Sequence, residues 1–385
     1  MIRQNLKYVI AIALAVAALC VARYLDNQPY QVAADPQLTR EREDFYATWA
    51  WEETQTLPEE TLATETAPVE TEPAERSPTR QRFLLTFVGD CTLGSNPVNY
   101  NAGLGFIKTV GEDYAYPFAN VAAYFENDDF TMVNLEGALC DEGSPVVKTH
   151  TFRGPTSYVN ILTENSVEAV TLANNHTEDY GETGYRTTLQ TLDTAGVPYV
   201  ERDSSLLFTT ESGLTIGVYA AVYYAIDVED MRQEIAQLRQ DGAEIVVFAP
   251  HWGYEHNFRP HHEQIEVGHA AIDAGADIVY GSHPHVLQPI EEYNGGIIYY
   301  SLGNFSFGGN IYPADFDTAL VQQEVIREVD GSITLGELIV VPCSVSSDSS
   351  RNNFQPTPYE EGSEEYSRVL SKLDGTWHIV SLPVG

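Results

Sequence analysis

The sequence has little positive charge and little cysteine. Lys and Arg number 20 against 56 Asp and Glu, so the 385-residue chain carries a formal charge of −36 at pH 7. Most of its surface would repel a polymer of phosphates, which argues against nonspecific binding of nucleic acid. Four cysteines without a CxxC pair exclude a disulfide scaffold and give no sign of a structural zinc or a thioredoxin-like redox site. The chain also has no internal repeat.

The sequence does contain 43% hydrophobic residues, which is enough for a large core. Its length allows two domains at most. Residues 1–25 have the composition of a targeting segment, with basic residues followed by an apolar run over 8–22. The weak small-x-small cleavage site at 20–22 favours an uncleaved signal anchor over a signal peptide. We therefore expect a cell-membrane protein whose remainder lies outside the cytoplasm, or a secreted protein if the segment is cleaved.

Residues 26–82 are rich in Glu, Thr, Pro and Ala. Their low hydrophobicity and acidic excess cannot offset the entropy lost on ordering, so we interpret them as a linker. At residue 83 the pattern changes to apolar runs separated by glycine-bearing turns, and a single folded domain is predicted over 83–385.

This domain alternates strand-like and helix-like segments, which indicates an α/β architecture with helices packed over one or more sheets. Apolar runs predict strands, and apolar residues at helical spacing, ended by Gly196, Gly242 and Gly275, predict three helices. The predicted strands are 83–88, 130–134, 167–173, 214–222, 244–250, 277–281 and 296–302, and the predicted helices lie within 185–196, 227–242 and 265–275.

Polar residues follow these strands where each one ends. In an open α/β sheet, ligands bind beyond the carboxyl ends of the strands, so we expect the side chains to converge. Carboxylate, amide and imidazole ligands together suit Mn²⁺, Fe or Zn²⁺ better than Ca²⁺. The residues are Asp90, Asn134, Glu136, Asn174, Asn175, His176, His251, His283 and His285.

Simpler interpretations exist for single residues. Asp90 could serve only a turn, and His251 could be a half-buried histidine with ordinary hydrogen bonds. His269 lies on the apolar face of its helix and is interpreted as a core residue. Cys91 and Cys140 could pair outside the cytoplasm, although small buried thiols are favoured. Solvent exposure or substrate contact is expected for the histidines of a polar loop, His256, His261 and His262.

Six segments, in order, resemble the CapA family of poly-gamma-glutamate capsule biosynthesis proteins, which is similar to the calcineurin-like metallophosphoesterases. The resemblance covers residues 83 to about 370 and implies two packed mixed β-sheets, flanked by helices, around a two-metal centre. The segments are FVGDCTLG (87–94), VNLEGAL (133–139), TLANNHTEDYGETG (171–184), APHWGYE (249–255), GADIVYGSHPHVLQPIE (275–291) and YYSLGNFSFG (299–308).

The resemblance also implies roles for individual residues. His176 would donate a proton to the leaving group, and Asp90 would belong to both the catalytic and the metal-binding group. Thr92 stands where the superfamily has a histidine ligand, so either a single metal or a replacement ligand such as Glu255 would be consistent. The implied metal ligands are Asp90, Glu136, Asn175, His251, His283 and His285.

Two functions are compatible with these features. The first is a membrane-anchored, extracytoplasmic CapA-like protein of capsule polymer synthesis or export, in which a metal-activated water attacks a phosphoester or, less favoured, an amide. Arg153, Glu255 and Asn304 would hold the anionic substrate, and other capsule synthesis subunits would be partners. The second is a non-catalytic polymer-binding or assembly subunit on the same fold. Metal content separates the two, because only the hydrolase requires one or two divalent metal ions.

Overall fold

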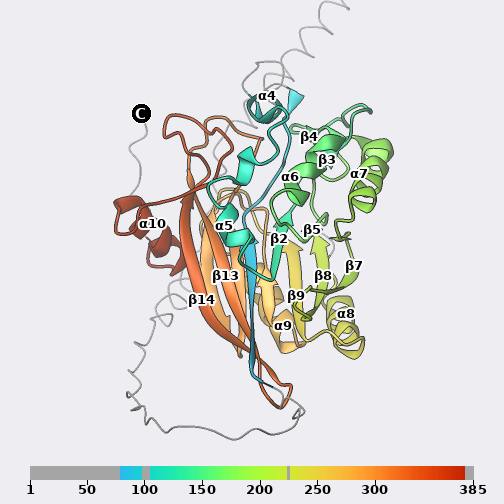
Figure 1. Cartoon of the computed structure of the whole chain (residues 1–385), viewed down its shortest axis with the longest axis vertical. Coiled ribbons are helices and arrows are strands. Elements are labelled where there is room, and N and C mark those ends of the chain that lie inside the picture. The colour runs from blue at the N-terminus through green and yellow to red at the C-terminus, as the bar shows by residue number, and fades with distance from the viewer. Residues whose placement is uncertain (1–78, 98–104, 223–225, 378–385) are drawn as a thin grey trace, which may run out of the picture. The chain divides into compact units, whose positions relative to one another are not determined.

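The computed structural model describes residues 79–97, 105–222 and 226–377, all within one compact unit, Thr71–Gly385 (Figure 1). The predicted targeting segment 1–25, and the predicted linker except for its last four residues, lie outside the described residues. No helix in the described part of the chain is long and apolar enough to cross a membrane.

Two mixed β-sheets form the centre of this unit. The strands of the first sheet are β1 (Gln81–Val88), β2 (Phe130–Asn134), β5 (Ala169–Thr171), β6 (Tyr199–Val200), β13 (Asp317–Arg327), β14 (Ile333–Ser344) and β15 (Thr357–Pro358). Those of the second are β7 (Ser204–Thr209), β8 (Thr215–Val222), β9 (Ile245–His251), β10 (Ile278–Tyr280), β11 (Leu287–Tyr293) and β12 (Gly296–Leu302). A further pair joins β3 (Ala138–Leu139) to β4 (Arg153–Gly154).

Each sheet has a parallel centre and antiparallel edges. The orders are β15-β14-β13-β1-β2-β5-β6 and β11-β12-β10-β9-β8-β7. The parallel strands of the first sheet are β1, β2, β5 and β6, and those of the second are β8, β9, β10 and β12. The strands that run antiparallel to their neighbours are β13, β14 and β15 in the first sheet and β7 and β11 in the second. The parallel strands therefore present their carboxyl ends together in each sheet.

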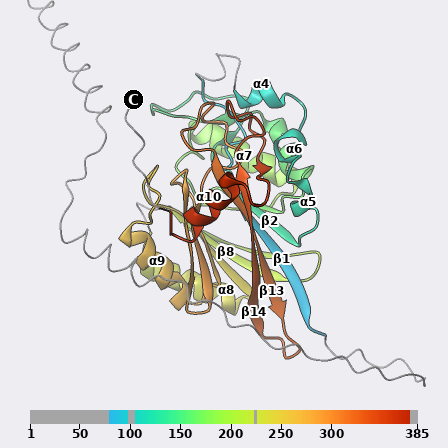
Figure 2. The same ribbon diagram turned by 90° about the vertical axis from the view of Figure 1, so that its left-hand side faces the viewer.

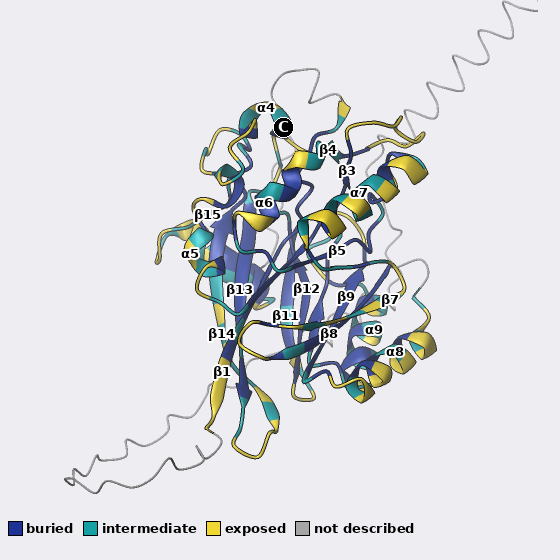
Figure 3. Cartoon of the chain, turned by 45° about the vertical axis from the view of Figure 1, so that its right-hand side comes forward, coloured by how far each residue is buried: buried dark blue, intermediate teal, exposed yellow. Residues whose placement is uncertain are grey.

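Side chains alternate between two faces along the central strands, as the strand period requires. In β9, Ile245 and Val247 enter a core that also contains Phe87 and Met132 of the first sheet, while Phe248 enters a separate core with residues of the second sheet's helices. Another core joins the outer face of the first sheet to its helices. The result is a helix–sheet–sheet–helix sandwich with buried strands and half-exposed helices (Figures 2 and 3).

Most helices cover the outer faces of the sheets. The helices are α4 (Phe106–Val110), α5 (Ala122–Phe125), α6 (Val159–Thr163), α7 (Gly181–Ala195), α8 (Val228–Gln240), α9 (His262–Asp273) and α10 (Glu364–Leu373), with short 3₁₀ turns η1 (Tyr116–Phe118) and η2 (Thr156–Tyr158). The last one, α10, instead contacts β11, β13 and β14 and places Val369 and Leu373 in the core between the sheets. The three predicted helices are confirmed as α7, α8 and α9. Asp227 accepts hydrogen bonds from the first turn of α8, and Gly196 ends α7 in the left-handed conformation that favours glycine.

All seven predicted strands are present, although β5 is shorter than the predicted 167–173. The sequence prediction missed the longer strands β7, β11, β13 and β14, and it also missed the two-residue strands β3, β4, β6 and β15. Burial along β7 alternates between half-buried and exposed, and much of β14 is only half-buried. Neither strand therefore shows the continuous apolar run by which buried strands are recognised.

Candidate metal centre

The ends of the parallel strands bring the predicted side chains to one place. Asp90 follows β1, Glu136 follows β2, and His251 ends β9. Backbone contacts hold the loops together: Asp90 N donates to Gly303 O at 2.8 Å, and Glu136 N donates to Cys91 O at 2.8 Å. Loops of both sheets thus meet at one edge of the sandwich.

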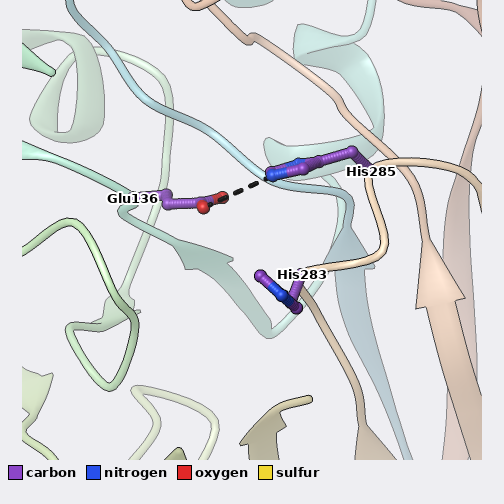
Figure 4. A group of neighbouring side chains, drawn as sticks. All are labelled: Glu136, His283 and His285. Carbon is purple, nitrogen blue, oxygen red and sulfur yellow. Dashed lines mark ion pairs between the residues drawn. The ribbon is translucent and has the colours of Figure 1, made fainter. Parts of the chain in front are cut away.

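Glu136 lies at the middle of this edge. Its side chain is fully buried, and neither carboxylate oxygen has a hydrogen bond to any of the described residues. Burial, together with the nearby Asp90 carboxylate, raises the pKa of Glu136 well above its usual range. The imidazole Nε2 atoms of His251 and His285 each lie 3.7 Å from Glu136 Oε1, and that of His176 lies 3.9 Å away. Figure 4 shows Glu136 and His285 directed at one another, with His283 beside them.

The second nitrogen of each imidazole is held from behind. His251 Nδ1 lies 2.9 Å from Ser282 Oγ, and His285 Nδ1 lies 2.9 Å from Asn304 Oδ1. Because the Asn304 oxygen can only accept, Nδ1 of His285 is the donor in this contact, and Nε2 is the ring atom that faces Glu136. Partners of this kind behind the ring are typical of metal-ligating histidines.

Burial, opposed by the carboxylates of Glu136 and Asp90, leaves the pKa of His285 raised to about 10. The pKa of His283 is lowered to about 4 by burial and by His285. His283 has a backbone φ of 99° and His285 a φ of 57°, a conformation that costs non-glycine residues energy. The His283 Nδ1 atom is buried and has no hydrogen-bond partner within the part of the chain that the structure describes.

His176 belongs to a separate polar group at the same edge. Its Nδ1 atom lies 2.7 Å from Asp179 Oδ2, which also accepts from Phe152 N at 2.7 Å. Lys148 Nζ donates to Asp179 Oδ1 at 3.0 Å and to the backbone oxygen of Asn175. Burial lowers the pKa of His176 although Asp179 opposes this.

Two asparagines at the end of β5 have different roles. Asn175 is half-buried, and its Oδ1 lies 3.0 Å from His251 Nε2. Asn174 is buried and shapes the loop, since its Oδ1 accepts from His176 N and its Nδ2 donates to Asn134 Oδ1. Asn175 therefore faces the cluster, whereas Asn174 supports it.

The three predicted substrate residues occupy different surroundings. Arg153 stacks over the Tyr180 ring at 4.6 Å, and Glu255 is exposed beside the cluster, close enough to affect the pKa of His283. Asn304 holds His285, as described above, so its side chain is engaged with the cluster itself.

The sequence reasoning overlooked Lys148, Asp179 and Ser282. Asp179 lies three residues after His176, a spacing that could have suggested a local pair. Lys148 comes from a distant loop, and no sequence pattern indicated that it would reach this place.

The side chains of His261, His262, His269 and the described cysteines are not among those that face the Glu136 carboxylate. His269 bonds Glu291 at 3.0 Å and stacks on Tyr293, so it is half-buried in a polar contact and not in the core as predicted. His261 and His262 begin α9 where a loop was predicted, and with Glu263 they form a second group that could bind a metal ion. The cysteines of the described residues are buried and unpaired: Cys91, Cys140 and Cys343.

The donors around Glu136 fit a divalent cation. Glu136, His283 and His285 each offer a ligand atom within 4.8 Å of the others. Ligands bonded to one cation at about 2.1 Å and separated by a tetrahedral angle lie about 3.4 Å apart, close to the 3.7 Å between Glu136 Oε1 and the nearest imidazoles. A carboxylate with several imidazoles suits Zn²⁺, Mn²⁺ or Fe.

The chain matches known proteins over much of its length. The family model "Bacterial capsule synthesis protein PGA_cap" matches residues 84–309. The PGA biosynthesis protein CapA of Bacillus subtilis (strain 168) is 35% identical over 298 residues, which are 69% of this chain and 74% of that protein. The capsule biosynthesis protein CapA of Bacillus anthracis is 28% identical over 299 residues, 70% of this chain and 69% of that protein.

A more distant relative is a probable polyglutamine synthesis accessory protein of Mycobacterium tuberculosis, 26% identical over 227 residues, which cover 50% of this chain and 60% of that protein. Among solved structures, the purple acid phosphatase PPD1 from yellow lupin (Lupinus luteus) seeds aligns with 68% of this chain and 53% of its own, at 10% identity and a TM-score of 0.31.

Proposed function

The chain belongs to the bacterial capsule synthesis family PGA_cap, and from this we propose that it acts in poly-gamma-glutamate capsule biosynthesis as a metal-dependent hydrolase of the calcineurin-like type. The capsule assignment follows from the names of its relatives, and the hydrolase assignment from the candidate metal centre. Fold and family alone do not determine chemistry, so the hydrolase assignment must be supported by the residues of the candidate metal centre.

Glu136 is the observation that carries the hydrolase proposal. A fully buried carboxylate with no hydrogen bond is strongly unfavourable unless an opposite charge compensates it. The imidazoles of His251 and His285 face the same oxygen with their outer nitrogens already held. Glu136, His251, His283, His285 and the Asn175 amide would hold the cation.

A bound divalent cation would supply the Lewis acid that polarises the electrophile and lowers the pKa of water. The chain supplies the proton. Asp179 accepts from His176 Nδ1 and stabilises the protonated imidazole, so the Nε2–H of His176 in its doubly protonated form faces the reaction centre and can give its proton to the leaving oxygen, which leaves the neutral ring. Asp179 holds that ring, and Lys148 holds Asp179.

A phosphoester is the favoured substrate and an amide the less favoured one. A cation at Glu136 would create a local positive patch on a chain of formal charge −36, and that patch would attract an anionic group. Membrane anchoring through residues 1–25, an extracytoplasmic location and association with other capsule synthesis subunits belong to the same proposal, supported by the composition of that segment and by the family.

Hydrolysis of a panel of phosphomonoesters and phosphodiesters by the full chain tests the hydrolase. We expect turnover that a chelator abolishes and that falls at least about 100-fold in His176→Ala. The matched control is His262→Ala, which removes an exposed histidine at the start of α9. If the wild-type protein is well folded but binds no metal and hydrolyses none of these substrates, the hydrolase proposal is refuted.

The alternative is a non-catalytic polymer-binding or assembly subunit. One observation favours it: Thr92 replaces the histidine that the phosphoesterase resemblance would require, and its buried hydroxyl accepts from Gly308 N at 2.6 Å. Poly-gamma-glutamate bound with equal affinity by wild type and Glu136→Gln, without hydrolysis by either, would support this function.

A further inference from the structure

We propose that the centre holds a single divalent cation on the Glu136 side and that Asp90 is a positioning residue for His285 instead of a ligand. This inference rests on the proposed metal centre, and it chooses between the alternatives that the absent histidine at position 92 left open. It also changes the role of Asp90, which the sequence placed among the metal ligands.

Asp90 already has partners from the chain itself. Its side chain is 1% exposed, and its Oδ1 accepts from Asn134 Nδ2 at 2.9 Å. Its Oδ2 accepts from His283 N at 3.3 Å and forms an ion pair at 3.1 Å with His285 Nδ1, which also lies 2.9 Å from Asn304 Oδ1. Both oxygens of Asp90 therefore already have donors from the protein.

Glu136 differs from Asp90 in this respect. Among the described residues no donor lies within hydrogen-bond reach of either Glu136 oxygen, while the Nε2 atoms of His251 and His285 each lie 3.7 Å from Oε1. That separation is too long for a hydrogen bond and suits atoms that share a cation. The buried carboxyl group that lacks a donor is therefore Glu136 and not Asp90, and one cation on that side would supply its missing partner.

The His285 ring lies between the carboxylates of Asp90 and Glu136. His285 Nδ1 faces Asp90, and His285 Nε2 faces Glu136. This is the arrangement in which an outer carboxylate orients a ligating histidine and raises its basicity. The backbone of Asp90 is fixed for this purpose, because its N donates to Gly303 O and its O accepts from Phe305 N, each at 2.8 Å.

Position 92 provides no ligand for a second cation on the Asp90 side. Thr92 is fully buried, and Gly308 N donates to its hydroxyl. A Cβ atom on Gly308 would lie 1.7 Å from Gly94 O, so the backbone around Thr92 is already in close contact. A third ligand for an Asp90 cation is therefore not available from position 92.

Titration of metal-free, full-length protein with Zn²⁺, followed by calorimetry and elemental analysis, tests the proposal. We expect one equivalent at the centre in wild type. Asp90→Asn keeps that equivalent with a Kd about 10- to 100-fold higher, because the amide oxygen still accepts from His285. Asp90→Ala binds more weakly than Asp90→Asn, and Glu136→Gln loses the equivalent. The matched control, Asp113→Asn, changes an exposed aspartate and leaves binding unaltered.

Circular dichroism of each variant confirms folding, and His262→Ala identifies any Zn²⁺ bound by the group at the start of α9. Two equivalents at the centre in wild type, one of them lost in Asp90→Asn, would overturn the inference and leave the hydrolase standing. One equivalent without hydrolysis would refute the hydrolase and leave the inference standing. Wild type without bound Zn²⁺ would refute both.

Discussion

At the scale of single residues, the chemistry depends on how three side chains are paired. Glu136 has no hydrogen-bond partner, Asp90 has several, and His176 has Asp179. An ionised carboxylate can only accept hydrogen bonds, so it determines which nitrogen of a neighbouring imidazole carries the proton. Removing such a carboxylate changes the reaction while leaving the fold intact.

Asp179→Asn should lower kcat by at least about 100-fold, because the amide no longer fixes the Nδ1 proton of His176. Metal content should not change, since Asp179 does not face Glu136. Steady-state kinetics and elemental analysis measure the two quantities. A loss of metal together with activity would show that Asp179 supports the metal centre instead of the proton donor.

Lys148→Met should lower kcat about tenfold with little change in KM. Its ammonium lies 3.2 Å from His176 Nδ1, behind the ring and away from the face that meets Glu136. Lys148→Arg should restore part of the loss, and Lys108→Met, at an exposed position on α4, should have no effect. A raised KM with unchanged kcat would instead make Lys148 a substrate-binding residue.

The sequence predicted the members of the cluster but not their pairing. Asp90, Glu136 and His285 could be placed at strand ends, and parallel strands bring such ends together. Whether a carboxylate faces a cation or a histidine depends on distances of an ångström, which strand assignments do not contain. Lys148 was unpredictable because its loop reaches the site only through tertiary contacts with Asp179.

At the scale of elements, two groups outside the metal centre join segments that are distant in the sequence. Helix α10 packs on β11, β13 and β14 (Figure 1). Lys372 and Arg368 of α10 both pair with Asp317, a fully buried carboxylate at the start of β13. Burial of Asp317 would raise its pKa, but the hydrogen bond from Arg368 and the charge of Lys372 lower it overall.

Lys372→Met should reduce the free energy of unfolding by about 3 kcal/mol, because it leaves Asp317 with one buried partner fewer. Lys372 Nζ also lies 2.7 Å from Asp315 Oδ2, so a second carboxylate loses its partner. The matched control is Arg186→Met, which breaks an exposed pair with Glu182 on α7 and should have almost no effect. Urea denaturation measures both variants. Equal losses of unfolding free energy in Lys372→Met and Arg186→Met would contradict the role of burial.

Glu168 should make stability depend on pH. Burial raises its pKa from 4.5 to about 7, so the folded state binds more protons than the unfolded state between these values. The free energy of unfolding therefore falls as pH rises from 4.5 to 7. Glu168→Gln should gain stability relative to wild type between pH 5 and pH 7.5. Urea denaturation at both pH values measures this difference. If the free energies of unfolding of the two proteins differ by the same amount at pH 5 and at pH 7.5, the effect is excluded.

Apolar periodicity predicted the central strands and missed those with polar faces. Strands β2 and β12 are buried along their whole length and were predicted with the correct bounds. Strand β13 contains Gln322 and Gln323, which are buried because their amides donate to Thr86 Oγ1 and to the backbone. Such compensation by hydrogen bonds is a property of the folded structure, so the sequence pattern did not reveal it.

At the scale of the whole folded unit, the metal centre joins the two sheets. Glu136 follows a strand of the first sheet, whereas His251, His283 and His285 follow strands of the second. A cation bound by both groups links the layers, and any ligand that binds only the folded state stabilises it.

Zn²⁺ at 100 times its Kd should raise the free energy of unfolding by about 2.7 kcal/mol. For a unit of this size we expect the Tm to rise by roughly 5 °C. Glu136→Gln should show no such rise, and thermal unfolding of the full chain with and without Zn²⁺ measures both. A similar rise in Glu136→Gln would place the stabilising cation elsewhere, for example at His261, His262 and Glu263.

The most direct test is a crystal structure of the full chain grown with Zn²⁺, with anomalous diffraction recorded at the zinc absorption edge. We predict one strong anomalous peak at the strand ends, within bonding distance of Glu136 Oε1 and of imidazole nitrogens of His251, His283 and His285. Asp90 should remain on His285 Nδ1. The absence of a peak beside Glu136 in well-ordered crystals would contradict the metal centre, and with it the proposed hydrolase.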